Sequence, residues 1–291
     1  MHRVGVVLHP TRPVQRALDT LRDWTAAQGL ELVQLEAGDG RPRRSLSGEV
    51  AACDLVAAVG GDGTVLAALH AAAPTGTPVL GVACGSLGAL STVSEDELRA
   101  GLDRVVAGEW WPRRLPALVV ETGEGQPLRA VNDVVLVRRG GTQLLVEVSA
   151  GHDLYARMAG DGVVVATPLG SSAYSMAAGG PVIAAGTDAF LCTPLAMHGG
   201  CAPPLVVPAE TEFVLQVDPG WGGFDLELDG HSVDSAADRF AVSLERDYAT
   251  LVGLGDTDSG VPRLRKRGLV TDSPRVLARD ARARSAVRAP K

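Results

Sequence analysis

The chain has 291 residues, of which 46% are apolar, so it can bury a sizeable core and is not intrinsically disordered. Its formal net charge of -7 at pH 7 gives no overall attraction to nucleic acid or to an anionic membrane surface. No stretch reaches the roughly 18 apolar residues of a membrane span, and the N-terminus lacks a signal-peptide pattern. The four cysteines show no CxxC spacing, which favours reduced, structural thiols. We therefore expect a cytoplasmic protein with no nucleic-acid or membrane partner.

The first third of the chain alternates β-rich runs with helical patterns. The predicted strands lie at 3–9, 31–36, 54–60 and 78–84. The predicted helices lie at 13–29, 64–73 and 94–109. Such alternation is typical of a parallel sheet with crossover helices. We therefore expect an α/β domain over residues 1–112.

After residue 112 the pattern changes to strands separated by Gly, Pro and Asp turns. These strands are predicted at 115–121, 129–139, 143–151, 162–168, 204–218, 224–230 and 239–245. Successive strands without long helices between them indicate a second, antiparallel and largely all-β domain over residues 113–250. The small-residue stretch 170–180 interrupts the strands and can form a short helix.

The final segment, residues 251–291, is strongly basic although the chain as a whole is acidic. We interpret it as a solvated tail or as a return segment that packs on the first domain. A nucleic-acid role is disfavoured because no aromatic residues are interleaved with the basic ones to stack on bases.

A glycine-rich loop with a single acid follows the strand predicted at 54–60. It contains Gly60, Gly61, Asp62, Gly63 and Thr64. Glycines let the backbone approach a phosphate closely, and the start of the following helix adds a favourable partial charge. Asp62 could then accept a proton from an attacking hydroxyl or help to hold Mg²⁺. The alternative is a tight turn in which Asp62 caps the helix.

Two further segments carry polar side chains in unusual places. The stretch from Asp161 to Tyr174 combines glycines with the hydroxyls of Thr167 and Ser172, which suits ribose and phosphate recognition, and Tyr174 can pack on a base. Its alternative is a polar β-turn. The pair at 132–133, Asn-Asp, interrupts an apolar strand, so at least one of the two side chains faces a ligand or a buried partner.

Taken in order, these motifs resemble the NAD kinase family. The resemblance rests on GGDGT, on the Asn-Asp pair, on the pattern DGxxxxTPxGSxAYxxxAGGP, and on a glycine stretch with Gly81, Gly85, Leu87, Gly88 and Leu90. It extends over roughly residues 3–250. It implies an N-terminal α/β domain, a C-terminal β-sandwich domain and an active site between them. It also implies transfer of a phosphoryl group from ATP, or in some members polyphosphate, to the 2′-hydroxyl of NAD, with a divalent metal such as Mg²⁺, by a homodimer or homotetramer.

The resemblance also assigns roles to individual residues. Asp62 resembles the catalytic base of the family. Its phosphate loop corresponds to Gly60, Gly61, Gly63 and Thr64. The residues that resemble its substrate-binding set are Asn132, Asp133, Asp161, Thr167, Ser172, Ala173, Tyr174 and His198.

Three positions depart from the family pattern. Ala83 and Ala89 stand where the family has Asn and Phe, and Pro203 stands where Arg is common. The missing Phe is an aromatic wall for the adenine of the acceptor. Two alternatives to an NAD kinase therefore stay open: a kinase for another hydroxyl acceptor (a nucleoside, a sugar or another small alcohol), and a catalytically silent nucleotide-binding regulator.

Overall fold

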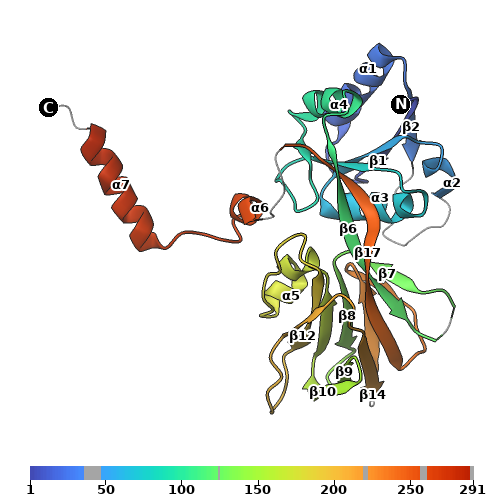
Figure 1. Ribbon diagram of the computed structural model, residues 1–291, viewed down its shortest axis with the longest axis vertical. Helices are drawn as coiled ribbons and strands as arrows, with labels where there is room; N and C mark the ends of the chain where they lie inside the picture. The colour runs from blue at the N-terminus through green and yellow to red at the C-terminus, as the bar shows by residue number, and fades with distance from the viewer. Residues whose placement is uncertain (36–46, 124, 219–221, 256–260, 289–291) are drawn as a thin grey trace.

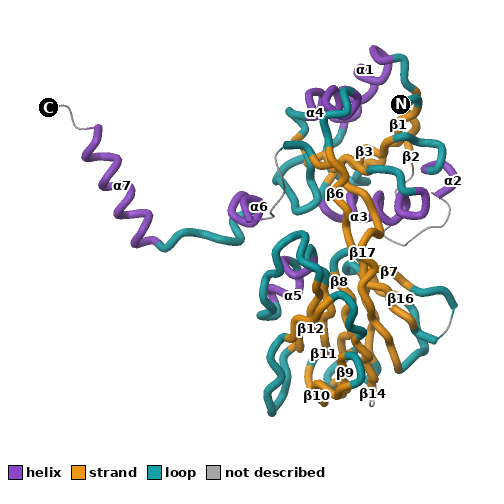
Figure 2. Tube along the Cα trace, viewed as in Figure 1, coloured by secondary structure: helices purple, strands orange, loops and turns teal. Residues whose placement is uncertain are grey.

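The structure, a computed structural model, describes residues 1–35, 47–123, 125–218, 222–255 and 261–288. Figure 1 shows two parts stacked along the long axis, with two long strands running between them. Helices belong almost entirely to the first part and to the C-terminal segment, and strands dominate the second part (Figure 2). The two-domain architecture expected from the sequence is confirmed.

The first part is a parallel sheet with helices on both faces. Its strands are β1 (Arg3–Leu8), β2 (Glu31–Leu35), β3 (Leu55–Gly60), β4 (Val79–Ala83) and β5 (Val93–Ser94). Its helices are α1 (Gln15–Gln28), α2 (Ser47–Val50), α3 (Asp62–Ala72), the 3-10 turn η1 (Ala73–Thr75) and α4 (Leu98–Val106). The strand order is β5-β4-β3-β1-β2, and every pair is parallel.

Alternation of side chains along these strands separates the two faces. Val4 and Val6 of β1 pack with α1 and α4, whereas Val7 faces the cluster that contains the apolar side of α3. Because neighbouring residues of a strand point to opposite faces, one apolar run supports helices on both sides. The carboxyl ends of the central strands are thereby left at one edge, where ligands bind in folds of this kind.

The second part consists of antiparallel strands in two packed sheets. They are β6 (Trp111–Glu121), β7 (Leu128–Ala130), β8 (Asp133–Arg138), β9 (Leu144–Ala150), β10 (Asp153–Gly160), β11 (Gly162–Ala166), β12 (Ala189–Leu195), β13 (Leu205–Pro208), β14 (Phe213–Asp218), β15 (Phe224–Leu228), β16 (His231–Val233) and β17 (Arg239–Gly253). One sheet has the order β13-β12-β11-β8-β15-β16. The other contains β10, β9, β14 and β17. Phe190 and Phe213 meet edge to face in the core between the sheets, with ring centroids 5.1 Å apart.

The stretch between β11 and β12 forms the short helix that its small residues allow. It folds into a 3-10 turn, η2 (Gly170–Ser172), and one turn of α-helix, α5 (Tyr174–Ala177). Both lie on the side of the second part that faces the C-terminal segment (Figure 1).

The long strand β17 joins the two parts into one sheet of 11 strands. It pairs with β14 in the second part and, through Leu251, with Val79 of β4 in the first. Its register with β6 shifts between Glu245 and Ala249, which marks a bulge at the junction. The boundaries proposed at 112 and 250 both fall inside strands, β6 and β17, so the domains share elements rather than being joined by linkers.

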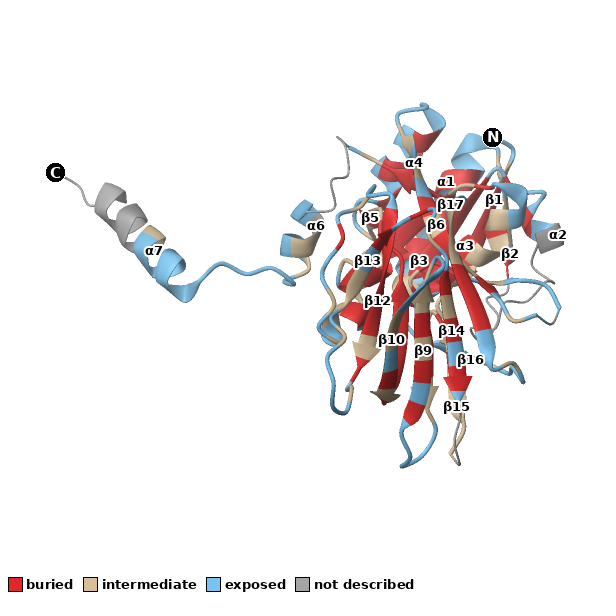
Figure 3. Cartoon of the chain, turned by 60° about the horizontal axis from the view of Figure 1, so that its bottom comes forward, coloured by how far each residue is buried: buried red, intermediate tan, exposed pale blue. Residues whose placement is uncertain are grey.

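The C-terminal segment carries α6 (Val261–Lys266) and α7 (Pro274–Arg288). Helix α7 stands away from the rest of the chain in Figure 1, and its first residues are exposed in Figure 3. The segment touches the second part at Arg267, whose Nη1 donates to Ser172 Oγ at 3.3 Å. Across the described ranges, no helix is long and apolar enough to span a membrane. All four cysteines are free thiols, and Cys201 is the exposed one.

Candidate functional site

The glycine-rich loop lies where β3 ends and α3 begins. Strand β3 ends at Gly60, Gly61 takes the N-cap position with an extended backbone, and Asp62 is the first residue of the helix. No side chain caps this helix. The alternative in which Asp62 serves as the N-cap is therefore wrong, because its carboxylate does not cap the helix.

The carboxylate of Asp62 is held by the glycine stretch that follows β4. Oδ2 accepts the backbone N–H of Ala89 at 2.9 Å, and Oδ1 accepts that of Leu90 at 3.0 Å. A Cβ on Gly88 would lie 2.0 Å from Asp62 Oδ1, so only glycine leaves room for the acid at that position. Two backbone donors thus fix the orientation of the carboxylate, while each oxygen retains a lone pair for a proton or a ligand.

The glycines of the loop serve two different purposes. A Cβ on Gly60 would lie 2.4 Å from Thr64 Oγ1, so Gly60 is needed for the packing of the loop itself. A Cβ on Gly63 would meet nothing within 4 Å. The packing of the protein therefore does not require glycine at 63, and the open space beside it is available to a ligand at the start of α3.

A cation that the sequence interpretation missed lies against this loop. Arg12 is in the connection between β1 and α1, and Leu8 at the end of β1 pairs with Val59 just before Gly60. A Cβ on Gly61 would lie 3.1 Å from Arg12 Nη1, and the same nitrogen donates to the Cys84 carbonyl at 3.5 Å. Among the residues that the structure describes, no carboxylate forms an ion pair with Arg12. The feature of the sequence that could have identified Arg12 is its position just after the first strand of the predicted parallel sheet, at the edge where ligands bind.

The Asn-Asp pair lies at the beginning of β8 rather than inside a strand, which corrects the expectation from the sequence. Asn132 is partly exposed, whereas Asp133 is buried. Burial, followed by the negative charges of Asp229 and Glu227, raises the pKa of Asp133 to about 7, against the lowering effect of the backbone N–H of Tyr174. The Asp133 side chain is therefore a buried link to α5, and Asn132 is the member of the pair that solvent and ligands can reach.

The segment after β11 folds directly against this pair. Thr167 is fully buried, and its hydroxyl donates to the Val131 carbonyl at 2.7 Å and accepts the N–H of Gly170 at 3.1 Å. A Cβ on Gly170 would lie 1.9 Å from the Asn132 carbonyl oxygen. Thr167 thus holds the bend, while the Tyr174 side chain, on a residue that is 44% exposed, is available for contact with a base.

The two halves of the site meet at α3. Val131 lies just before β8, and Leu169 lies just after β11. Both pack in one apolar cluster with Val65, Leu66 and Leu69 of α3. The predicted residues of the second domain that lie on the segments around Val131 and Leu169 are Asn132, Asp133, Thr167, Ser172, Ala173 and Tyr174. Asp62 and the glycine loop lie at the start of α3, the helix that packs on the same cluster.

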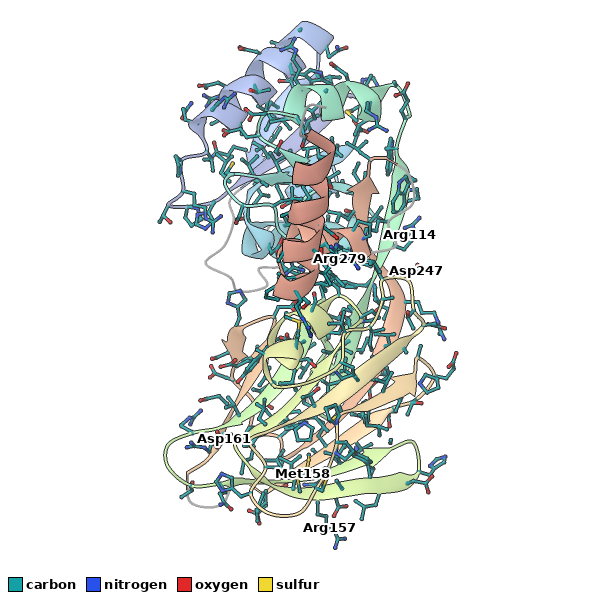
Figure 4. The ribbon with its side chains drawn as sticks, turned by 90° about the vertical axis from the view of Figure 1, so that its left-hand side faces the viewer. Arg114, Arg157, Met158, Asp161, Asp247 and Arg279 are labelled. Carbon is teal, nitrogen blue, oxygen red and sulfur yellow. The ribbon has the colours of Figure 1, made fainter. Side chains whose placement is uncertain are left out.

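Asp161 and His198 lie elsewhere. Asp161 precedes β11, whose other end pairs with Asp133, so about 20 Å of extended chain separates Asp161 from Thr167. Its carboxylate accepts from Arg138 Nε at 2.5 Å, and His198 donates its backbone N–H to Ala159 nearby at 2.7 Å. Figure 4 shows Asp161 in the lower half of the second part, away from the junction marked by Arg114. Within one chain these two residues are not brought to Asp62.

The three departures from the family pattern also occupy different places. Ala83 is 2% exposed inside β4, and the Pro203 carbonyl accepts the hydroxyl of Tyr155 in the second part. Ala89 alone of the three contacts Asp62, through its backbone N–H. Ala83 pairs with Gly60, so it lies beside the glycine loop as well, whereas Pro203 lies in the second part.

Comparison with known proteins agrees with this geometry. Residues 39–110 match the ATP-NAD kinase N-terminal domain, and residues 131–234 match the ATP-NAD kinase C-terminal domain. The NAD kinase of Heliobacterium modesticaldum is 35% identical over 229 residues, which is 75% of this chain and 80% of that protein. The NAD kinase of Symbiobacterium thermophilum is 39% identical over 182 residues, which is 61% of this chain and 64% of that protein.

Solved structures show the same fold at lower identity. Yeast NADH kinase complexed with NADH is 20% identical, with a TM-score of 0.75 over 94% of this chain and 89% of that one. An NAD kinase from Archaeoglobus fulgidus in complex with ATP is 22% identical, with a TM-score of 0.75 over 92% of this chain and 100% of that one.

Proposed function

Because this chain belongs to the NAD kinase family, we propose that it transfers a phosphoryl group from ATP to the 2′-hydroxyl of the adenosine ribose of NAD, giving NADP. The observation that carries the proposal is the carboxylate of Asp62, fixed by two backbone donors at the start of α3. In the reaction the ribose oxygen attacks the γ-phosphorus, the bond from that phosphorus to the β–γ bridging oxygen breaks, and ADP leaves. The hydroxyl proton passes to Asp62.

The donor phosphates fit the glycine loop. The open space beside Gly63 and the N-terminus of α3 favour an anion, and Arg12 supplies a full positive charge beside Gly61. Catalysis of phosphoryl transfer consists mostly of positioning and electrostatic stabilisation, so these groups account for a large share of it. The acceptor ribose would then lie between Asp62 and the segment of Asn132 and Tyr174.

The residues present fit a divalent cation that ATP itself carries. In the described ranges there is no group of three or more His, Cys, Asp or Glu side chains that could hold a metal alone. Mg²⁺ commonly binds substrate phosphates and only one or two carboxylates, and keeps several waters. The glycine loop offers one carboxylate, Asp62, with a lone pair remaining on each oxygen. When bound, the cation would neutralise part of the negative charge of the ATP phosphates.

The direct test is incubation of the full chain with ATP, Mg²⁺ and NAD, followed by enzymatic measurement of NADP. Formation of NADP and ADP in equal amounts supports the proposal. Labelled phosphate transferred to another nucleoside or sugar, but not to NAD, would show a different acceptor, and Ala89 would be the first position to examine. Binding of ATP without turnover on any acceptor would indicate a regulator instead.

Arg12→Gln is expected to raise the KM for ATP by about tenfold to a hundredfold, the value of a hydrogen bond to a charged group. The KM for NAD should change less than about threefold, because the proposal assigns Arg12 to the phosphates of ATP and not to NAD. Initial rates with either substrate varied separate the two constants. Arg22→Gln is the matched control, since Arg22 lies on α1 in an exposed pair with Asp19. An unchanged KM for ATP in Arg12→Gln would remove Arg12 from the donor site.

We further propose that the protein works as a homo-oligomer in which a second copy brings Asp161 and His198 to the acceptor. Support comes from their place at the far end of β11, remote from the Asp62 of their own chain. Light scattering should then give a mass of at least two chains. Mixing inactive Asp62→Asn with inactive Asp161→Asn, after exchange of subunits, should restore part of the activity. No recovery from subunits shown to have mixed would contradict the proposal.

A further inference from the structure

One buried carboxylate, Asp229, connects the two halves of the site. Its side chain is 4% exposed, and Oδ2 lies 2.8 Å from Nε2 of His70 on α3. The same carboxylate accepts the backbone N–H groups of Val131 at 2.9 Å, Asn132 at 2.6 Å and Asp133 at 3.2 Å. It therefore contacts α3 of the first domain and, at the same time, residues 131–133 of the second domain, which we call the acceptor segment.

The hairpin turn explains how Asp229 reaches both. Leu228 pairs with His231, so Asp229 and Gly230 form a two-residue turn between β15 and β16. Both have positive φ, 52° and 79°, as a type I′ turn requires, and Asp-Gly is a favoured sequence for that turn. The backbone of Asp229 also donates to the Asp133 carbonyl at 2.9 Å. The turn thus lies against the start of β8 with its carboxylate pointing at the backbone of the acceptor segment.

His70 connects this carboxylate to the catalytic helix. It lies about two turns after Asp62 on α3, so the helix is a short rigid rod with the proposed base at one end and His70 near the other. Its second nitrogen, Nδ1, lies 2.9 Å from the hydroxyl of Tyr248 on β17. If that hydroxyl donates, Nε2–H donates to Asp229, and all three side chains are satisfied.

We call the contacts of His70 with Asp229 and Tyr248 the clasp. It lies where the sheet that joins the domains is irregular. The pairing of β17 with β6 shifts register between Glu245 and Ala249, and Tyr248 lies within that shift. A bulge bends a strand and interrupts its hydrogen bonds to the neighbouring strand. The sheet alone therefore constrains the angle between the two domains only weakly at this point. The contact from His70 to Asp229 adds a constraint across the same junction.

From this geometry we infer that His70 and Asp229 are positioning residues, which set the distance between Asp62 and the acceptor segment at Asn132. The inference rests on the proposed function, because it concerns the placement of the NAD ribose against the base. Neither residue needs to touch a substrate. Misplacement of a reacting group by about 1 Å can cost a hundredfold in rate.

The test compares His70→Leu with His70→Gln, which retains an N–H donor for Asp229, in the full chain. His70→Leu should lower kcat/KM for NAD by about tenfold to a hundredfold, while the Kd for ATP stays within about twofold. His70→Gln should recover most of the loss. The matched control is His231→Leu, at an exposed histidine of β16, which should keep wild-type constants.

A readout independent of turnover is amide hydrogen exchange of the segment 128–136. In His70→Leu the amides that donate to Asp229 should exchange faster, whereas those of β3 should not. Wild-type constants and wild-type exchange in folded His70→Leu would overturn the inference. So would an equal loss of ATP and NAD binding, because a purely structural role affects both. If the wild-type chain makes no NADP, the proposed acceptor fails instead, and exchange alone still decides whether the clasp orders the segment.

Discussion

Asp62→Asn is expected to lower kcat for NADP formation by about 10²- to 10⁴-fold, the usual contribution of a positioned general base. Asn has nearly the same shape as Asp, and its amide oxygen can still accept one of the two backbone N–H groups that hold the carboxylate. It cannot take up the proton of the ribose hydroxyl. The KM for NAD and the Kd for metal-free ATP should therefore stay within a few-fold, and the loss should appear in kcat.

The measurement is the initial rate of NADP formation at saturating ATP, with ATP affinity from calorimetry and folding checked by thermal unfolding. Asp19→Asn, at an exposed acid of α1, is the matched control for the change of Asp to Asn. An Asp62→Asn enzyme with kcat within about threefold of the wild type would show that another group accepts the proton.

The sequence predicted the first domain well because its signals are local. An apolar strand buried on both faces and an amphipathic helix each show a pattern within a few residues, and β1, α1, β2, β3, α3 and β4 were predicted within a few residues of their ends. The one-turn helix α2 was not predicted, because four residues are too few to show a helical period. The predicted helix 94–109 begins later, at Leu98, because Glu97 bonds back to Ser94 ahead of the helix. Strands β10, β12 and β16 were missed. The first half of β10 is exposed and shows little alternation, and β16 has only three residues. Strand β12 is an apolar run that the sequence does contain and that the interpretation overlooked.

The site was predictable where one loop contains the chemistry, and not where distant segments meet. Asp62 and its glycines are adjacent in sequence, so their type and spacing point to a phosphate site. Asp229 acts through backbone groups nearly a hundred residues earlier, and its Asp-Gly sequence signals only a hairpin turn. The separation of Asp161 from Thr167 follows from the extended length of β11, which a motif written as a line of letters does not convey.

Gly88→Ala should disable the enzyme through Asp62, although residue 88 carries no functional group. The added Cβ would lie 2.0 Å from Asp62 Oδ1 and 2.6 Å from its Cγ, so the carboxylate must move away from the N–H groups of Ala89 and Leu90. The backbone of Gly88 does not have a positive φ, so the effect is a collision and not backbone strain. We expect kcat to fall by about a hundredfold, as for a misplaced catalytic group.

Gly141→Ala is the matched control, because a Cβ there meets nothing within 4 Å and φ is not positive. It should leave kcat unchanged. The double variant Gly88→Ala/Asp62→Asn makes the test specific. If glycine at 88 serves only to make room for the carboxylate, Gly88→Ala can do no further harm once Asp62→Asn has removed the proton acceptor. The kcat of the double variant should then be about that of Asp62→Asn alone. Losses that multiply would mean that Gly88 shapes the site in a second way, for instance by letting the backbone approach the acceptor ribose.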